Sequence, residues 1–278
     1  MYNPFVSQNV STKTIIITGA SSGIGRATAR ALAQERANLV LVARREKLLA
    51  SLAEEVNAKG GISLVLPLDL RQKDHVKTMV DSTHKQFGRI DVLINNAGFG
   101  FCGSVENTPP EIVREIFALN FEAALLGCQL VVPIMKASGS GHIINISSVA
   151  GRRGLPLNGI YSATKFALNG MSEALRIELQ GSGINVSIIN PAATETEFGK
   201  SVRYGDVKEK FKAMGRVQSS DEVAAAIVRC IKDPKIEVYP YGLSKLLAWG
   251  NAIAPSLIDK IIMRAYRDRM RARASAST

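Results

Sequence analysis

A chain of 278 residues, 46% of them hydrophobic, is long enough to bury a substantial core and fits one large domain. No apolar run reaches the roughly 18 residues of a membrane-spanning helix, and residues 1–12 lack the basic start and apolar stretch of a secretory signal, so we expect a short loose arm there. The net charge of +11 comes without zinc-finger spacing or basic-zipper heptads, which disfavours a nucleic-acid-binding protein.

Cysteine and histidine, which form disulfides and most transition-metal sites, are few and scattered. They are Cys102, Cys128, Cys230, His75, His84 and His142. The odd number of cysteines and the lack of ligand spacing predict no disulfide framework and no metal site. We expect the cysteines to be small core residues of a cytoplasmic protein, and His75 and His84 to be solvated on a polar helix.

Short β-branched and hydrophobic runs alternate with longer helical segments. Strands are predicted at residues 14–18, 39–42, 63–66, 92–94, 142–148, 185–189 and 236–239, and helices at residues 26–33, 46–59, 72–87, 111–136 and 160–180. Residues 219–222 are expected to cap a further helix, and the polar segment before them, up to about residue 215, to be a loop with some helix. This alternation predicts an α/β fold, a doubly wound parallel sheet in a single domain over residues 1–242 with a helical C-terminal extension at 243–278.

The first predicted strand runs into a glycine-rich turn at the beginning of a helix. Its residues include Gly19, Ser21, Ser22, Gly23, Ile24 and Gly25. Glycine permits a tight turn and close approach of the backbone to a pyrophosphate, and the following helix N-terminus offers free N–H groups. The spacing G-x-x-x-G-x-G differs from the commoner G-x-G-x-x-G, so the turn favours dinucleotide binding, with an ordinary glycine-rich turn as the alternative.

Two arginines, Arg44 and Arg45, follow the second predicted strand. An NAD site usually carries an acidic residue here, about 20 positions beyond the glycines, to bind the ribose 2′-hydroxyl. A guanidinium instead binds a 2′-phosphate bidentately. The pair therefore favours NADP(H) over NAD(H), unless both arginines simply begin a solvated helix.

Tyr161 and Lys165 lie four residues apart at the beginning of a predicted helix and share one face of it. A neighbouring ammonium group is expected to lower the tyrosine pKa from about 10, so that the phenol can act as a general acid–base group. Ser148 lies at the carboxyl end of the preceding strand, where open α/β sheets bind ligands. Without Ser148 and the glycine-rich turn, a surface tyrosine and a solvated lysine would explain the pair equally well.

Four motifs occur in a characteristic order. They are Thr18-Gly-Ala-Ser-Ser-Gly-Ile-Gly25, Asn95-Asn-Ala-Gly98, Asn145-Ile-Ser-Ser148 and Tyr161-Ser-Ala-Thr-Lys165. Together they resemble the short-chain dehydrogenase/reductases over about residues 12–240. The resemblance implies a Rossmann-type fold and a catalytic tetrad of Asn120, Ser148, Tyr161 and Lys165. In this tetrad, Tyr161 would give its proton to a carbonyl oxygen that Ser148 hydrogen-bonds, Lys165 would lower the tyrosine pKa and hold the nicotinamide ribose, and Asn120 would help to hold a water.

The resemblance also implies the cofactor contacts. Asp69 and Leu70 would contact the adenine ring, while Asn95 and Ala97, with Gly98 beside them, would line the adenosine side of the cleft. Thr194 and Thr196 follow Pro191 where contacts to the nicotinamide amide and the phosphates are expected. Pro191-Ala192 departs from the family's common Pro-Gly and leaves the conformation of this loop open, because alanine disfavours a positive φ.

The C-terminal extension is apolar at residues 243–253 and basic after Pro255. Leu257, Ile258, Ile261 and Ile262 recur at helical spacing and predict an apolar stripe with basic residues beside it. Three interpretations remain: a helix packed on the body with a solvated basic face, a lid over the substrate cleft, or a membrane-surface helix.

These features predict an NADP(H)-dependent oxidoreductase that interconverts a carbonyl and an alcohol on a lipophilic small molecule. Phe99, Phe101 and Leu155 are candidates for an apolar pocket or for ordinary core. The long apolar helices at 111–136 and 160–180 resemble those that pair between family subunits, so we expect a homodimer or homotetramer. A cytoplasmic location is expected, with a peripheral membrane contact as an option. The alternatives are a non-catalytic nucleotide-binding regulator and a membrane-recruited scaffold.

Overall fold

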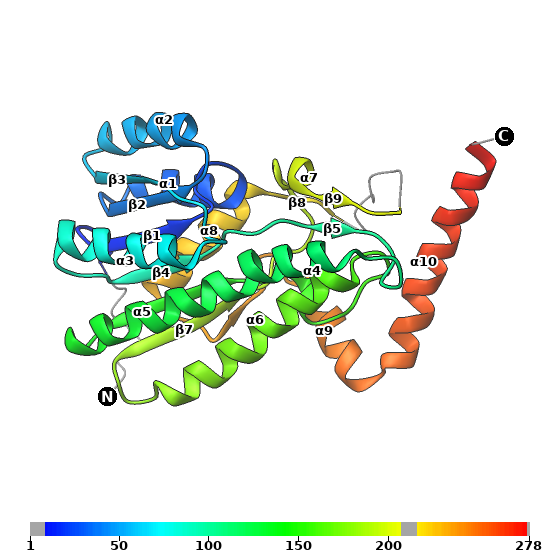
Figure 1. Ribbon diagram of the computed structural model, residues 1–278. Helices are drawn as coiled ribbons and strands as arrows, with labels where there is room; N and C mark the ends of the chain where they lie inside the picture. Colours follow the sequence, from blue (N-terminus) through cyan, green and yellow to red (C-terminus); the bar gives the residue numbers. More distant parts are fainter. Residues whose placement is uncertain (1–8, 207–215, 277–278) are drawn as a thin grey trace.

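The computed structural model describes residues 9–206 and 216–276. A seven-stranded parallel sheet forms its centre, with the strand order β11-β7-β6-β4-β1-β2-β3 (Figure 1). Its strands are β1 (Thr14–Thr18), β2 (Asn38–Ala43), β3 (Ile62–Pro67), β4 (Val92–Asn95), β6 (Gly141–Ile146), β7 (Ile184–Ile189) and β11 (Glu237–Val238). The chain order reverses between β1 and β4, and such a switch point is where open α/β sheets bind ligands. The predicted doubly wound fold is confirmed.

Helices cover both faces of the sheet. They are α1 (Gly23–Ala33), α2 (Glu46–Asn57), α3 (Lys73–Phe87), α4 (Pro110–Phe117), α5 (Ala123–Ala137), α6 (Gly159–Glu178) and α8 (Ser220–Lys232). Successive residues of a strand point to opposite faces, so Ile15 and Ile17 pack with α1, α2 and α8, whereas Ile16 packs with α3 and α5. The central strands are therefore apolar on both sides. This explains why they appear in the sequence as continuous hydrophobic runs.

The π-helical turn η1 (Ala118–Glu122) joins α4 and α5 into one long helix. By length and composition alone, Pro110–Ala137 is the one described helix that could cross a membrane. Its buried positions, among them Ile116, Cys128 and Val131, instead pack in the protein core, and Asn120 within it is also buried. We therefore interpret it as a core helix of the α/β domain.

Several local predictions need correction or completion. Val10 lies in the core, so residues 9–12 are not a loose arm, and residues 1–8 lie outside the described part. Four two-residue strands outside the main sheet escaped prediction: β5 (Phe101–Cys102), β8 (Thr194–Glu195), β9 (Arg203–Tyr204) and β10 (Gln218–Ser219). Each forms only because two distant loops meet, as β5 meets β9 and β8 meets β10. The loop expected up to residue 215 contains α7 (Phe198–Ser201), and its last part, 207–215, is outside the described residues.

The predicted cap of α8 is confirmed. Ser219 Oγ accepts a hydrogen bond from Glu222 N at 3.1 Å, and the Glu222 carboxylate accepts one from Ser219 N at 2.8 Å. This reciprocal capping box satisfies two backbone donors at the helix start. The chain then continues through β11 into a helical hairpin of α9 (Leu243–Ile253) and α10 (Pro255–Ala276), which extends from one end of the domain (Figure 1).

Glycine at position 25 permits the close approach of α1 to the first turn. A Cβ there would lie 2.5 Å from Gly19 O, which is backbone and cannot move aside easily. We expect Gly25→Ala to lower the free energy of unfolding by about 1–3 kcal/mol, measured by urea denaturation. The control is Gly154→Ala in an exposed loop, where a Cβ meets no atom within 4 Å, and this substitution should change the free energy of unfolding by less than about 1 kcal/mol. Equal effects of the two substitutions would refute this role of Gly25.

Candidate active site

Ser148 lies between the end of β6 and a short helical turn, η2 (Val149–Gly151). It is the N-cap of that turn, with extended backbone angles, and its Oγ accepts a hydrogen bond from Ala150 N at 3.1 Å. The preceding Ser147 is buried and bonds Lys165 O instead. Neighbouring residues in extended backbone point in opposite directions. Ser147 points into the core, so Ser148 points the other way and is half-buried at the carboxyl edge of the sheet.

Tyr161 lies in the first turn of α6, and Lys165 follows one turn later. The Lys165 side chain is only 5% exposed, and its Nζ donates a hydrogen bond to Ile146 O, the last residue of β6, at 2.8 Å. Nζ lies 5.8 Å from the centroid of the Tyr161 ring. The predicted phenol, ammonium and hydroxyl groups therefore meet at one end of β6, where the Ser148 hydroxyl is close enough to the Tyr161 phenol to lower its pKa.

The protonation of these groups differs from the prediction made from spacing. Burial raises the pKa of Tyr161 to about 12, although the hydrogen bond with Ser148 lowers it. Burial also lowers the pKa of Lys165 to about 8, because a desolvated ammonium is destabilised. The expected lowering of the tyrosine pKa by Lys165 is therefore wrong for the chain itself. At neutral pH Tyr161 is a protonated phenol and thus a proton donor.

Asn120 lies in the π-helical turn η1 and is buried. Its Oδ1 accepts a hydrogen bond from Phe99 N, and its Nδ2 donates to Phe99 O, both at 3.0 Å. Nδ2 also donates to Thr164 Oγ1, between Tyr161 and Lys165 in sequence, at 3.2 Å. The side chain thus joins the loop after β4 to α6. Gly98 lies against it, since a Cβ at Gly98 would be 3.0 Å from Asn120 Oδ1.

The carboxyl ends of β1 and β4 are joined through Thr18. Its Oγ1 accepts hydrogen bonds from Asn96 N and Ala97 N at 2.9 Å and donates to Ile94 O. This fixes the Asn-Asn-Ala-Gly motif beside the glycine-rich turn. The Asn95 side chain is buried and bonds Asn145 at 2.8 Å, so it positions two strands and does not face the cleft. The expectation that Asn95 lines the adenosine side is therefore wrong for its side chain.

The glycine-rich turn has the geometry expected of a phosphate-binding loop. Gly19 and Gly23 have φ values of +70° and +54°, which favour glycine. The turn leads into α1 at Gly23, so the N-terminus of this helix and its free N–H groups lie at the carboxyl edge of the sheet. The Thr196 side chain lies against Gly23, where a Cβ would be 3.0 Å away.

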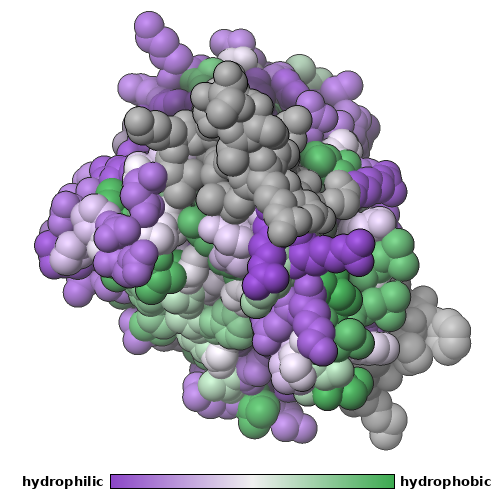
Figure 2. All heavy atoms as spheres, turned by 90° about the vertical axis from the view of Figure 1, so that its right-hand side faces the viewer, coloured by the Kyte–Doolittle hydropathy of each residue, from purple (hydrophilic) through white to green (hydrophobic). Residues whose placement is uncertain are grey.

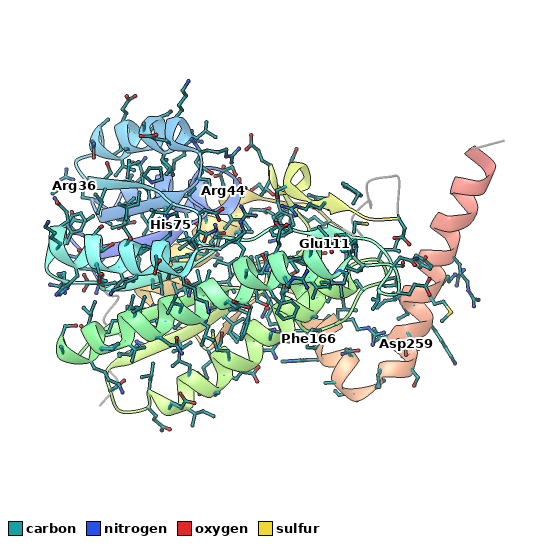
Figure 3. The ribbon with its side chains drawn as sticks, in the orientation of Figure 1. Arg36, Arg44, His75, Glu111, Phe166 and Asp259 are labelled. Atoms are coloured by element: carbon teal, nitrogen blue, oxygen red, sulfur yellow. The ribbon has the colours of Figure 1, made fainter. Side chains whose placement is uncertain are left out.

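Arg45 lies over the same turn. Its guanidinium donates to Ser22 Oγ at 2.6 Å and to Ser21 Oγ at 3.1 Å, and it pairs with Glu197 at 3.0 Å. Arg44 is exposed, and it lies with His75 at this end of the sheet (Figure 3). Both arginines are therefore at the carboxyl end of β2, where the sequence predicted a 2′-phosphate contact.

Asp69 and Leu70 follow β3. The Asp69 carboxylate is hydrogen-bonded by Arg71, which with a smaller effect from Arg44 holds its pKa below the usual range. Leu70 is buried. His75 Nδ1 lies 3.2 Å from Asp69 N, so the half-buried His75 supports this turn and is less solvated than predicted. His142 is buried in β6 with a pKa lowered by burial to about 3, and it bonds Ser187.

The loop after β7 extends from Pro191 across the site. Ala192 does not adopt a positive φ, and its N donates to Gln218 Oε1 at 3.0 Å, so the change from the common Pro-Gly is accommodated without strain. Thr194 Oγ1 bonds Ala192 O at 2.9 Å. Further along, the Phe198 ring lies 5.9 Å from the Tyr161 ring.

An apolar wall stands beside Tyr161. Phe99, Phe101 and Ile116 form a buried cluster against which Ile160 and Tyr161 pack. Sequence reasoning identified Phe99 and Phe101 but missed Phe198, because no signal in the chain indicates that the loop after β7 folds back. Leu155 is half-buried, and all three cysteines are buried, as expected. Within residues 9–206 and 216–276, no group of three His, Cys, Asp or Glu side chains could hold a metal ion.

Comparison with known families agrees with this geometry. A family model described as short chain dehydrogenase matches residues 13–206. The chain belongs to the short-chain dehydrogenase family. This short-chain dehydrogenase is 36% identical over 255 residues to the ketoacyl reductase HetN of Nostoc sp., a match that covers 90% of this chain and 88% of the relative.

Solved structures of short-chain dehydrogenases have the same fold. One from Burkholderia phymatum in complex with NAD has a TM-score of 0.81 at 25% identity, covering 90% of this chain and 96% of the other. L-sorbose reductase from Gluconobacter frateurii, in complex with NADPH and L-sorbose, has a TM-score of 0.75 at 29% identity, covering 84% and 96%. These neighbours hold either nucleotide, so the choice between them depends on this chain's own residues.

Burial of Lys165 predicts a pH-dependent stability. Its folded-state pKa of about 8 lies below the ordinary lysine value of 10.5, so between these two pH values the unfolded chain binds more protons. The free energy of unfolding should therefore rise with pH across this window, by on the order of 3 kcal/mol.

Lys165→Met should remove this rise, as measured by urea unfolding at several pH values from 7.5 to 10.5. Lys59→Met, at an exposed lysine, serves as the control and should keep the wild-type slope. Parallel curves for wild type and Lys165→Met would show that Lys165 is not desolvated.

Proposed function

We propose that this protein is an NADP(H)-dependent oxidoreductase that interconverts a carbonyl and a primary or secondary alcohol on a lipophilic substrate. The observation that carries this proposal is the meeting of Ser148, Tyr161 and Lys165 at the carboxyl end of β6. These groups lie at the ligand-binding edge of a sheet whose first turn has phosphate-loop geometry.

The residues at this edge fit a dinucleotide. The backbone comes close at the turn because Gly25 has no side chain, and the N-terminus of α1 offers N–H groups to a pyrophosphate. Arg44 and Arg45 would hold a 2′-phosphate, with Ser21 and Ser22 next to it. A phosphate would compete with Glu197 for the Arg45 guanidinium. These contacts support NADP(H) as the preferred cofactor.

The nicotinamide supplies the hydride when the cofactor is bound. In the reducing direction Tyr161, protonated at neutral pH, gives its proton to the developing alkoxide, and Ser148 donates a hydrogen bond to the same oxygen. Lys165, whose pKa of about 8 leaves it mostly protonated at neutral pH, is the cation that stabilises the resulting phenolate. Asn120 positions α6 and the loop after β4, and it acts through these elements without contacting the reacting atoms.

The surroundings of Tyr161 support a lipophilic substrate. Phe99, Ile160 and Phe198 line its side of the site, and such a wall excludes water and favours apolar groups. The Arg203 guanidinium lies 4.9 Å from the Phe99 ring and provides a cation at the rim. We infer that the substrate has an apolar chain or ring next to its carbonyl.

The outer sides of α5 and α6 support a homodimer or homotetramer. Phe166 and Ile177 on α6 are 45% and 61% exposed, and Phe166 is directed away from the sheet (Figure 3). On α5, Leu126 and Leu130 are only partly buried. Apolar faces of this kind are typical of subunit contacts. We propose that a second copy covers these faces, and that the protein acts in the cytoplasm.

Tyr161→Phe tests the proton-donor role. The substitution should lower NADPH-dependent carbonyl reduction by a factor of about 100 to 10,000, because the proton donor is lost. NADPH binding, followed by fluorescence, should change little. Tyr204→Phe, at an exposed tyrosine, is the matched control and should retain activity. Binding of NADPH by the wild type without turnover of any carbonyl in a broad panel would instead identify a nucleotide-binding regulator.

Arg44→Ala and Arg45→Ala test the cofactor preference. Each should raise the KM for NADPH by roughly 10- to 100-fold, since a charge-assisted hydrogen bond to the phosphate is lost, and should change the KM for NADH far less. Lys59→Ala provides a control for loss of a surface cation. A wild type that uses NADH better than NADPH, or variants that weaken both cofactors equally, would rule out a 2′-phosphate site here.

A further inference from the structure

The α9 helix presents apolar side chains to solvent. Leu243, Leu246, Trp249 and Ile253 are 61%, 59%, 55% and 84% exposed. Their spacing of three and four residues places them on one side of the helix, opposite the buried Ser244. An amphipathic helix packed on a protein core normally buries its apolar side. In α9 this side faces outwards.

The α10 helix continues this surface and adds positive charge. Leu257 and Ile261 are 58% and 51% exposed, while Ile258 and Ile262 are buried. Exposed cations lie beside them at Lys260, Arg264 and Arg267. Residues 243–276 contain seven basic and two acidic residues, which gives a net charge of +5 out of +11 for the chain. Figure 2 shows hydrophobic residues next to hydrophilic ones on this end of the molecule.

Trp249 and Lys245 form a pair of side chains suited to the lipid–water interface of a membrane. The Lys245 Nζ lies 4.7 Å from the Trp249 ring, and both side chains are exposed. A tryptophan ring places its apolar body in the acyl region and its N–H among the headgroups, and a neighbouring ammonium binds phosphate.

The hairpin is fixed to the body. Asn251 accepts a hydrogen bond from Arg153 at 2.7 Å and donates one to Arg152 O at 3.0 Å, and Arg153 also pairs with Asp259. Figure 3 shows Asp259 on the side of α10 that faces the domain. Arg152 and Arg153 follow η2, the turn capped by Ser148. The exposed surface is therefore held at the same end of the sheet as the candidate active site.

We propose that the α9–α10 hairpin is a docking surface for an anionic phospholipid bilayer. Its apolar residues enter the headgroup region, and Lys245, Lys260, Arg264 and Arg267 bind lipid phosphates. Charge complementarity favours this partner over a second copy of the chain, because a two-fold contact would bring the same cations together. The proposal does not depend on the catalytic function, since it rests on the exposed face alone.

Vesicle co-sedimentation of the full chain tests this proposal. The vesicles are pure phosphatidylcholine, or phosphatidylcholine with 30% phosphatidylserine. We expect at least about ten-fold stronger binding to the anionic vesicles, lost in high salt. The triple variant Leu246→Gln, Trp249→Gln, Ile253→Gln should lose binding by at least ten-fold. The variant Lys260→Glu, Arg264→Glu, Arg267→Glu should lose the preference for phosphatidylserine.

Matched controls show whether a loss of vesicle binding is specific to the hairpin or follows from removing any exposed apolar residue or any three positive charges. Ile62→Gln removes an equally exposed apolar side chain, and Lys73→Glu, Lys77→Glu, Lys85→Glu reverses three exposed cations on α3 at the opposite end of the molecule. Both should bind vesicles as the wild type does. Circular dichroism and the molar mass in solution are measured for every variant.

Two results would overturn the proposal. One is a wild type that stays in solution with all vesicles. The other is vesicle binding that the hairpin variants do not alter. If the apolar triple variant instead splits an oligomer while no form binds vesicles, the face is a contact between copies of the chain, and the bilayer proposal is wrong.

Discussion

The buried hydrogen bond from Lys165 Nζ to Ile146 O is the interaction on which the site depends. It joins the beginning of α6 to the last residue of β6, so it sets where Tyr161 stands relative to Ser148. Burying an ammonium group is unfavourable, and the lowered pKa of Lys165 reflects this cost. Such a desolvated cation with a single backbone partner is poised to interact with a negative charge that develops beside it. The neighbouring phenol is the group that acquires such a charge on losing its proton.

The rest of the fold holds this pair against the sheet's switch point. Thr18 joins β1 to the loop after β4, Asn120 joins that loop to α6, and Asn145 lies between Asn95 and Ser172 in a chain of buried side-chain hydrogen bonds. Each member of this network satisfies polar groups that would be costly to bury alone. The glycine-rich turn and the proton-donor site thus become parts of one rigid edge. Arg45, which follows β2, lies over the glycine-rich turn, and Phe198 in the loop after β7 lies beside Tyr161, so both border this edge.

Much of this arrangement could be predicted from the sequence, because it is local. Ile15, Ile16 and Ile17 form a run that only a doubly covered strand explains, and Gly19, Gly23 and Gly25 are required by backbone geometry at fixed spacing. What failed depends on long-range packing. Val10 lies in the core against residues distant in sequence, the Asn95 side chain bonds Asn145 on the neighbouring strand, and His75 bonds the backbone of Asp69 instead of facing only solvent. The pKa of Tyr161 was misjudged because spacing on a helix reveals a neighbouring charge but not the burial of both groups. That the apolar side of α9 faces solvent could not be predicted either. Hydrophobic periodicity shows that a helix has an apolar side, but it does not show whether that side packs on the domain.

The most direct test of the account is an NMR titration of protein carrying ¹³C at the tyrosine Cζ, with Tyr161 identified by its absence in Tyr161→Phe. We predict a neutral phenol signal up to at least pH 10 for the chain itself, and a titration at lower pH once NADP⁺ is added, because a cofactor held in the proposed site would bring positive charge near the phenol. A Tyr161 signal that titrates at the ordinary pKa of about 10, unaltered by NADP⁺, would show that the phenol is neither desolvated nor next to the nicotinamide, and would contradict the account.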